Sequence, residues 1–268
     1  MNILFLGDIV GASGCEAINK HLAKKIKESK IDFVIANGEN AAKEGVGITE
    51  EITNNLFDSG VDVITTGNHV WDQKEIIKHI ENEERLLRPL NLPQLSPGKG
   101  FGVFNSKNGP RIGVLNLMGN IFMKKCDDVF EAAQKFTMRN ALKKDYDVLV
   151  VDFHGEITSE KMAMGHFFDG KATLVVGTHT HVPTSDTMIL KNGTAYQSDA
   201  GMCGDYNSVI GMNKENSLNK FLKKSSQKHY PATGEATLCG SIIECNLETG
   251  LAKSIKQFIY GGILKYSN

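Results

Sequence analysis

The stretch Leu174-Val175-Val176-Gly177-Thr178-His179-Thr180-His181 holds the strongest structural signal in the chain. A short valine-rich run ends at a glycine, and two histidines follow one residue apart. Such a run is typical of a buried β-strand. In an extended segment, residues i and i+2 project to the same side, so both imidazoles can face one point in space. We therefore expect His179 and His181 to bind a metal ion.

Four other places repeat this plan, in which an apolar run is followed by side chains that can bind a metal. The runs cover residues 3–6, 33–36, 61–66 and 147–152. The potential ligands after them are, in the same order, Asp8, Glu39 with Asn40, Asn68 with His69, and His154. Any one of these endings is weak evidence, because a lone aspartate often serves a turn and a lone histidine often packs in a core. Open α/β sheets bind ligands at the carboxyl ends of their strands, so five such endings together predict one shared site.

Segments with helical periodicity separate the first strands, at about residues 13–29, 49–59 and 72–82. Strand alternating with helix predicts right-handed parallel β-α-β units. A further helix is expected over residues 128–144, and a short helix or loop over residues 214–228. Other short strands are expected at 102–104, 112–117, 188–190, 195–197, 237–247 and 254–259. With no repeat and no linker, we expect one domain over residues 1–268, an α/β two-sheet β-sandwich flanked by helices in four layers.

Composition and charge exclude several classes of protein. The 268 residues include 30 basic and 31 acidic side chains, so no global basic field favours nucleic acid or a membrane surface. The five cysteines are odd in number and lack C-x-x-C spacing, which favours reduced thiols over a disulfide framework. The first residues form a strand pattern and not a signal peptide, and no apolar run reaches the ~18 residues of a membrane helix. We expect a cytoplasmic protein.

The number and kind of donors predict two metal ions. A structural zinc site is closed by four ligands, typically Cys and His, whereas the strand ends here supply up to seven oxygen and nitrogen donors and no cysteine. These donors are Asp8, Glu39, Asn40, Asn68, His154, His179 and His181. Seven are too many for one ion and suit two, with Glu39 as the natural bridge. Imidazoles mixed with carboxylate and amide oxygens favour iron, manganese or zinc over magnesium alone. The sequence does not choose among these three, and iron is our first choice.

This donor set predicts a metal-dependent phosphoester hydrolase. Two ions about 3.5–4 Å apart clamp the attacking and leaving oxygens of an in-line displacement at phosphorus. They also lower the pKa of a shared water towards about 7, so that a bridging hydroxide can attack. His69 directly follows Asn68, so its side chain is expected to point away from the row of ligands. We choose His69 as the general acid, cationic before the step, which protonates the leaving group.

The order of these motifs resembles the calcineurin-like metallophosphoesterases, and most closely their YmdB-like bacterial branch. The resemblance covers nearly the whole chain and includes Gly7-Asp8-Ile9-Val10-Gly11, Asn37-Gly38-Glu39-Asn40 and Ser198-Asp199-Ala200-Gly201-Met202. The wider superfamily has a histidine two residues after the first aspartate, where this chain has Val10. It also usually bridges its metals with an aspartate, where this chain has Glu39. Both departures point to the branch.

The resemblance implies roles for the same residues. It implies Asp8, Glu39, Asn40 and His181 on one metal, and Glu39, Asn68, His154 and His179 on the other. It further implies His69 near the scissile phosphate and phosphodiesterase activity on cyclic nucleotides, including 2′,3′-cyclic nucleotides. A link to RNA turnover also comes from the resemblance alone. A phosphomonoesterase or nucleotidase stays open, as does a regulatory protein that binds nucleotide or RNA with negligible turnover. The native metals, the physiological substrate and a homo-oligomeric state also stay open.

Overall fold

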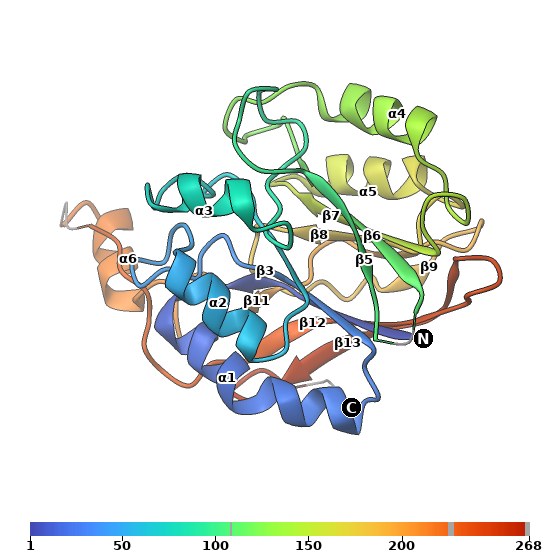
Figure 1. Cartoon of the computed structure of the whole chain (residues 1–268). Coiled ribbons are helices and arrows are strands. Elements are labelled where there is room, and N and C mark those ends of the chain that lie inside the picture. Colours follow the sequence, from blue (N-terminus) through green and yellow to red (C-terminus); the bar gives the residue numbers. More distant parts are fainter. Residues whose placement is uncertain (108, 225–227, 266–268) are drawn as a thin grey trace.

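Two mixed β-sheets pack face to face at the centre of the chain (Figure 1). The computed structural model describes residues 1–107, 109–224 and 228–265. The first sheet has the order β13-β12-β1-β3-β4, with β1 (Asn2–Leu6), β3 (Phe33–Asn37), β4 (Val63–Thr65), β12 (Leu238–Cys245) and β13 (Ala252–Tyr260). The second has the order β5-β6-β7-β8-β10-β9, with β5 (Phe101–Asn105), β6 (Arg111–Met118), β7 (Val148–His154), β8 (Leu174–Thr178), β9 (Met188–Ile189) and β10 (Ala195–Gln197).

The central strands of both sheets run parallel to their neighbours. In the first sheet Ile3 pairs with Phe33, and Ile35 pairs with Val63, so that β1, β3 and β4 end at one edge. In the second sheet β6, β7, β8 and β10 are parallel, with β5 and β9 antiparallel at the borders. The parallel β-α-β units expected for the first half are therefore confirmed.

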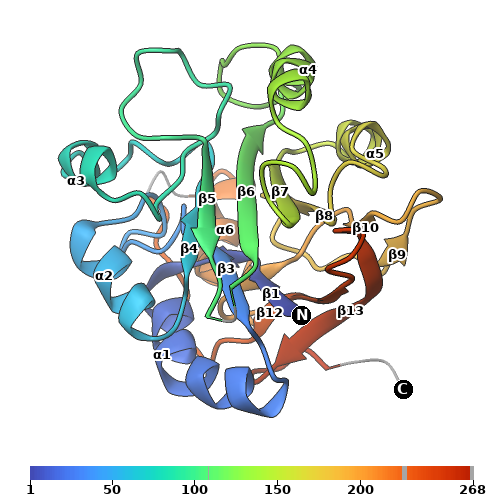
Figure 2. The same cartoon turned by 45° about the vertical axis from the view of Figure 1, so that its right-hand side comes forward.

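Helices cover the outer face of each sheet, so the molecule has four layers (Figure 2). The first sheet carries α1 (Gly11–Glu28), α2 (Glu50–Asp58) and α3 (Ile76–Asn82). The second carries α4 (Val129–Arg139) and α5 (Thr158–Phe167). A further helix, α6 (Lys214–Phe221), follows a short parallel pair formed by β2 (Asp8–Ile9) and β11 (Met202–Cys203). The predicted α/β sandwich flanked by helices is confirmed.

Alternating side chains on each strand explain how the layers hold together. Ile3 and Phe5 of β1 point between the sheets, where they pack with Val150 of β7 and other apolar residues. Leu4 and Leu6 of the same strand point to the opposite side, towards helices α1 to α3. Since both faces of these strands are buried, the strands are nearly continuous apolar runs, as parallel strands usually are.

Several predicted elements differ from those observed. The helix expected over 128–144 ends at Arg139, and the one expected over 72–82 begins at Ile76. Helix α5 and the short strands β2 and β11 were not predicted. The helix option for residues 214–228 holds for Lys214–Phe221, while residues 225–227 lie outside the described part. Thr49 caps α2 by accepting the backbone N–H of Ile52.

Within the residues that the structure describes, no helix combines the length and apolar character needed to cross a membrane.

Candidate metal centre

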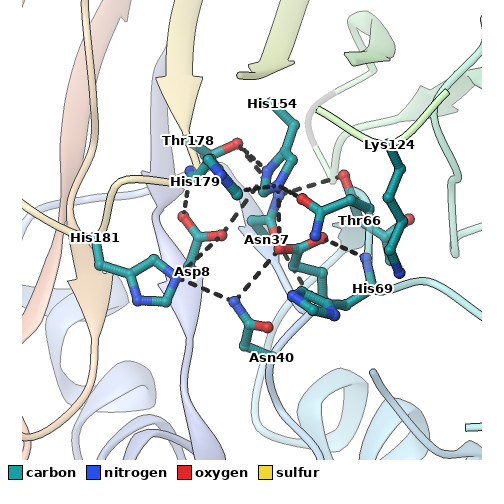
Figure 3. A network of polar contacts seen from close by, with 12 residues as sticks. Asp8, Asn37, Asn40, Thr66, His69, Lys124, His154, Thr178, His179 and His181 are labelled. Carbon is teal, nitrogen blue, oxygen red and sulfur yellow. Dashed lines mark hydrogen bonds and ion pairs between the residues drawn. The ribbon is translucent and has the colours of Figure 1, made fainter. Parts of the chain in front are cut away.

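All eight side chains selected from the sequence lie near one another, where strands of both sheets end. Asp8 follows β1, Glu39 and Asn40 follow β3, and Asn68 and His69 follow β4, all in the first sheet. His154 is the last residue of β7, and His179 and His181 follow β8 in the second sheet. Figure 3 shows the side chains from the two sheets turned towards a common centre.

One group of donors surrounds Nε2 of His154. This nitrogen lies 3.0 Å from Glu39 Oε1, 3.0 Å from Asn68 Oδ1 and 3.1 Å from His179 Nδ1. Glu39, His154 and His179 each offer a ligand atom within 4.8 Å of the other two, a spacing that fits one metal ion. Glu39 and His154 are fully shielded from solvent or nearly so.

A second group adjoins the first through Glu39. Asn40 Nδ2 lies 3.4 Å from Glu39 Oε1 and 3.0 Å from His181 Nε2. The carboxylate of Asp8 approaches the same nitrogen of His181, with Oδ1 3.8 Å from Nε2. A half-turn of the Asn40 amide would present its oxygen at the same place. The structure thus brings together two sets of donors that share Glu39.

Each of the three histidines uses its other ring nitrogen to bind a partner outside the cluster. His154 Nδ1 lies 2.9 Å from Thr178 Oγ1, whose own proton goes to Asp152 at 2.7 Å. His181 Nδ1 donates to the carbonyl oxygen of Ile210 at 2.7 Å. His179 Nε2 lies 3.0 Å from Glu156 Oε2. These bonds leave the lone pair of the inner nitrogen facing the cluster, which is how metal-binding histidines are oriented.

Electrostatics in the cluster favour a positive charge at its centre. Burial would raise the pKa of Glu39, but the adjacent His154 and His69 together outweigh burial and lower that pKa to about 2. Burial would likewise lower the pKa of His154, yet Glu39 and Asp8 raise it to about 9. Burial and the charge of His154 lower the pKa of His179 to about 3. The carboxylates therefore stabilise a cation between them, and a metal ion can replace the proton in that role.

Three further observations fit a metal site. Among the described residues, Oδ1 of Asp8 is buried without a hydrogen-bond donor, and an unsatisfied buried carboxylate oxygen is costly unless a cation faces it. Gly67, between β4 and the predicted ligand Asn68, keeps space open at the site, because a Cβ there would collide with the His154 ring and with Glu39 Oε2. His179 and His181 also have backbone φ angles of 103° and 67°, a left-handed strain that is typical of functional sites.

His69 lies at the rim of the cluster, where its ring contacts Asp72, a residue that the sequence did not single out. Its backbone N–H donates to Glu39 Oε2 at 3.1 Å, and its Nδ1 lies 2.6 Å from Asp72 Oδ2. The other oxygen of Asp72 accepts a hydrogen bond from Lys124 Nζ at 3.3 Å. The His69 ring also lines the cavity described next. The spacing of three residues between His69 and Asp72 is the sequence feature that could have predicted this contact.

A cavity of about 270 Å³ opens directly on the cluster. Glu39, Asn40, His69, His179 and His181 line it together with Glu156, which follows β7 and was also missed from the sequence. Ile210 and Met212 form part of an apolar wall. A small anionic group can therefore reach the donors from solvent.

Two packed mixed sheets, helices on both outer faces and donors at one edge define the metallophosphoesterase fold. The sulfate thiohydrolase SoxB of Thermus thermophilus shares this fold alone, with a TM-score of 0.53 at 11% identity over 93% of this chain and 43% of that one. The family model for YmdB-like proteins matches residues 4–258. The chain belongs to that family.

Relatives resemble the chain over nearly its whole length. A curated protein of Bacillus subtilis strain 168, named 2′,3′-cyclic-nucleotide 2′-phosphodiesterase, is 42% identical over 259 residues, which cover 97% of each chain. The crystal structure of a hypothetical protein from Thermus thermophilus has a TM-score of 0.89 and 39% identity, covering 98% of this chain and 100% of that one. The crystal structure of a phosphatase from Mycoplasma pneumoniae has a TM-score of 0.90 and 34% identity, covering 97% of this chain and 93% of that one.

Proposed function

We propose that this chain is a dinuclear metal-dependent phosphodiesterase that hydrolyses 2′,3′-cyclic nucleotides. The observation that carries the proposal is the pair of donor groups that share Glu39 and open on one cavity. The name and 42% identity of the Bacillus subtilis relative support the substrate class.

In this proposal the seven predicted ligands hold two ions. Asp8, Glu39, Asn40 and His181 hold one of them. Glu39, Asn68, His154 and His179 hold the other. The mixture of imidazole, carboxylate and amide donors favours iron, manganese or zinc over magnesium, and iron is our first choice among the three. When bound, such a pair of ions polarises phosphoryl oxygens and lowers the pKa of water towards about 7.

In this proposal, His69 protonates the leaving group. Its Nδ1 is fixed by Asp72 at 2.6 Å, so Nε2 is the nitrogen that can deliver a proton into the cavity. A cyclic phosphodiester opens when the bond from phosphorus to one ribose oxygen breaks, and that oxygen leaves as an alkoxide. His69 protonates the leaving oxygen at that point, a contribution that is typically 10²–10⁴-fold in rate.

The proposal is tested with a diester and a monoester, bis-p-nitrophenyl phosphate and p-nitrophenyl phosphate, before and after removal of metal by a chelator. We expect faster hydrolysis of the diester, loss of activity on chelation and recovery when metal is returned. Asp8→Asn, Glu39→Gln and His181→Ala should lose activity while the chain stays folded. Full activity of the metal-stripped protein would reject the proposal. A preference for the monoester would indicate a nucleotidase, and tight nucleotide binding without product would indicate a regulatory protein.

A further inference from the structure

The cavity wall carries a carboxylate that the proposed reaction does not use. Glu156 lies two residues beyond β7, its side chain is 47% exposed, and it lines the cavity beside His179. Glu39, the other acidic residue of the wall, is buried among the predicted ligands. Glu156 is therefore the acidic group on the described wall that an incoming substrate meets outside the ligand set.

Within the described residues, the charge of Glu156 is not neutralised by a basic side chain of the cavity wall. Glu156 contacts His179 Nε2 at 3.0 Å, and an imidazole that binds a metal through its other nitrogen is neutral. Two lysines near the cavity form ion pairs with other carboxylates. Lys161 lies 2.7 Å from Asp199, and Lys124 lies 3.3 Å from Asp72. Among the described lining residues there is no lysine or arginine.

The negative charge of Glu156 affects phosphodiesters and phosphomonoesters differently. A phosphodiester carries one negative charge, whereas a phosphomonoester has a second pKa near 6 and carries close to two at neutral or higher pH. A fixed carboxylate in the wall repels both, but it repels the additional charge of the monoester as well. Specificity that arises from an unfavourable contact with the wrong ligand is a general device.

We propose that Glu156 is a specificity-determining residue that makes the cavity select phosphodiesters over phosphomonoesters. The proposal rests on the phosphoesterase function proposed above and narrows it to one substrate class. Glu156 acts through its charge at the wall, and its contact with His179 keeps that charge in place.

The test replaces the charge and keeps the shape. Glu156→Gln retains an oxygen that accepts the His179 N–H, Glu156→Asp retains the charge, and Glu156→Ala provides a second neutral variant. At about pH 8, the ratio of kcat/KM for bis-p-nitrophenyl phosphate to that for p-nitrophenyl phosphate is measured for each. We expect the diester preference to fall about tenfold in the Gln and Ala variants and to persist in the Asp variant. The ratio cancels any common loss that comes from disturbing His179. Glu131→Gln, on the remote helix α4, controls for a general change of charge.

Binding provides a readout that does not depend on turnover. Calorimetry compares inorganic phosphate, a dianion at this pH, with dimethyl phosphate, a monoanion, on metal-loaded wild type and Glu156→Gln. We expect the affinity for inorganic phosphate relative to dimethyl phosphate to rise about tenfold in the variant. Equal preferences in the Gln and Asp variants would overturn the role of Glu156 even if the diester is hydrolysed well. Absence of hydrolysis by wild type would reject the proposed function, and the binding comparison would still decide the role of Glu156.

Discussion

At the residue scale, the histidines of the centre show which part of a site a sequence reveals. His154, His179 and His181 could be selected because they follow apolar strands and, in one case, alternate at i and i+2. Their outer partners could not be selected. Ile210 contributes only a carbonyl oxygen, and Glu156 contacts its histidine across the ends of two strands. A backbone or side-chain group that accepts one hydrogen bond from a distant residue leaves no local pattern in the sequence.

His69 is the residue whose role separates chemistry from metal binding. We expect His69→Ala to keep its metal and to lose about 10²–10⁴-fold in kcat, because the proton for the leaving oxygen is no longer supplied. The loss should be largest for esters with poor leaving groups, since p-nitrophenolate departs with little help. Kinetics with diesters of graded leaving-group pKa measure this dependence. An equal loss for all leaving groups would contradict a role as general acid.

Gly67 tests whether the space at the centre is needed for metal. In Gly67→Ala the added Cβ would meet the His154 ring and Glu39 Oε2, although every donor remains. We expect metal affinity to fall roughly 10- to 100-fold, the range typical when ligands lose their orientation. Metal titration followed by thermal unfolding measures the affinity and confirms the fold. Gly204→Ala, whose Cβ would meet Met202 Sδ at 3.3 Å, serves as the control. Wild-type affinity in Gly67→Ala would refute the close-approach argument.

At the scale of elements, the long strands were predictable, whereas helix α5 and the C-terminal end of helix α4 were not. The strands are almost wholly apolar because both of their faces are buried. Helix α5 buries Glu160 and Lys161 next to Met164, so its buried face is partly charged and shows no apolar stripe. Helix α4 ends at Arg139 because Asn140 turns to an extended conformation and its side chain caps the carbonyl of Phe136. The residues after Asn140 also favour a helix, so the sequence alone did not indicate that α4 ends at Arg139.

The buried lysine of α5, Lys161, forms an ion pair with Asp199. Lys161 Nζ lies 2.7 Å from Asp199 Oδ2, and that oxygen also accepts the backbone N–H and hydroxyl of Thr180, between the predicted ligands His179 and His181. Lys161→Met leaves a buried carboxylate without its cation, which typically costs about 3–5 kcal/mol of unfolding free energy. Urea denaturation measures the difference, with the exposed Lys191→Met as control. Unchanged stability of Lys161→Met would show that the pair does not hold this loop.

The start of β7 provides a prediction about pH. The carboxylate of Asp147 accepts the backbone N–H of Arg111 at 2.9 Å, and this bond holds the pKa of Asp147 below its usual 3.8. Because the pKa of Asp147 is lower in the folded chain than in the unfolded chain, ionised Asp147 stabilises the fold above pH 3.8. This stabilisation is lost as the pH falls through the pKa of Asp147 in the folded chain. Asp147→Asn should therefore be less stable than wild type at neutral pH, by less than about 1 kcal/mol for so accessible a group. The difference should vanish in acid. Urea denaturation at several pH values tests this, and a gap that widens in acid would contradict it.

At the scale of the whole molecule, the two sheets are joined directly behind the metal centre. Asp152 of β7 accepts hydrogen bonds from Asn37 of β3 at 3.0 Å and from Thr178 of β8 at 2.7 Å, and Thr65 of β4 donates to it as well. This polar network lies between sheets whose contact is largely apolar. The sequence predicted that the strand ends would converge, because parallel strands share a carboxyl edge. It could not predict the bonds that fix the two edges together, since they join residues up to 115 positions apart.

The metal content of the purified protein tests the central claim most directly. Elemental analysis should find about two transition-metal ions per chain, and Glu39→Gln should hold far less because it loses the shared ligand. A wild-type protein that hydrolyses the diester at full rate with no bound transition metal would contradict the account.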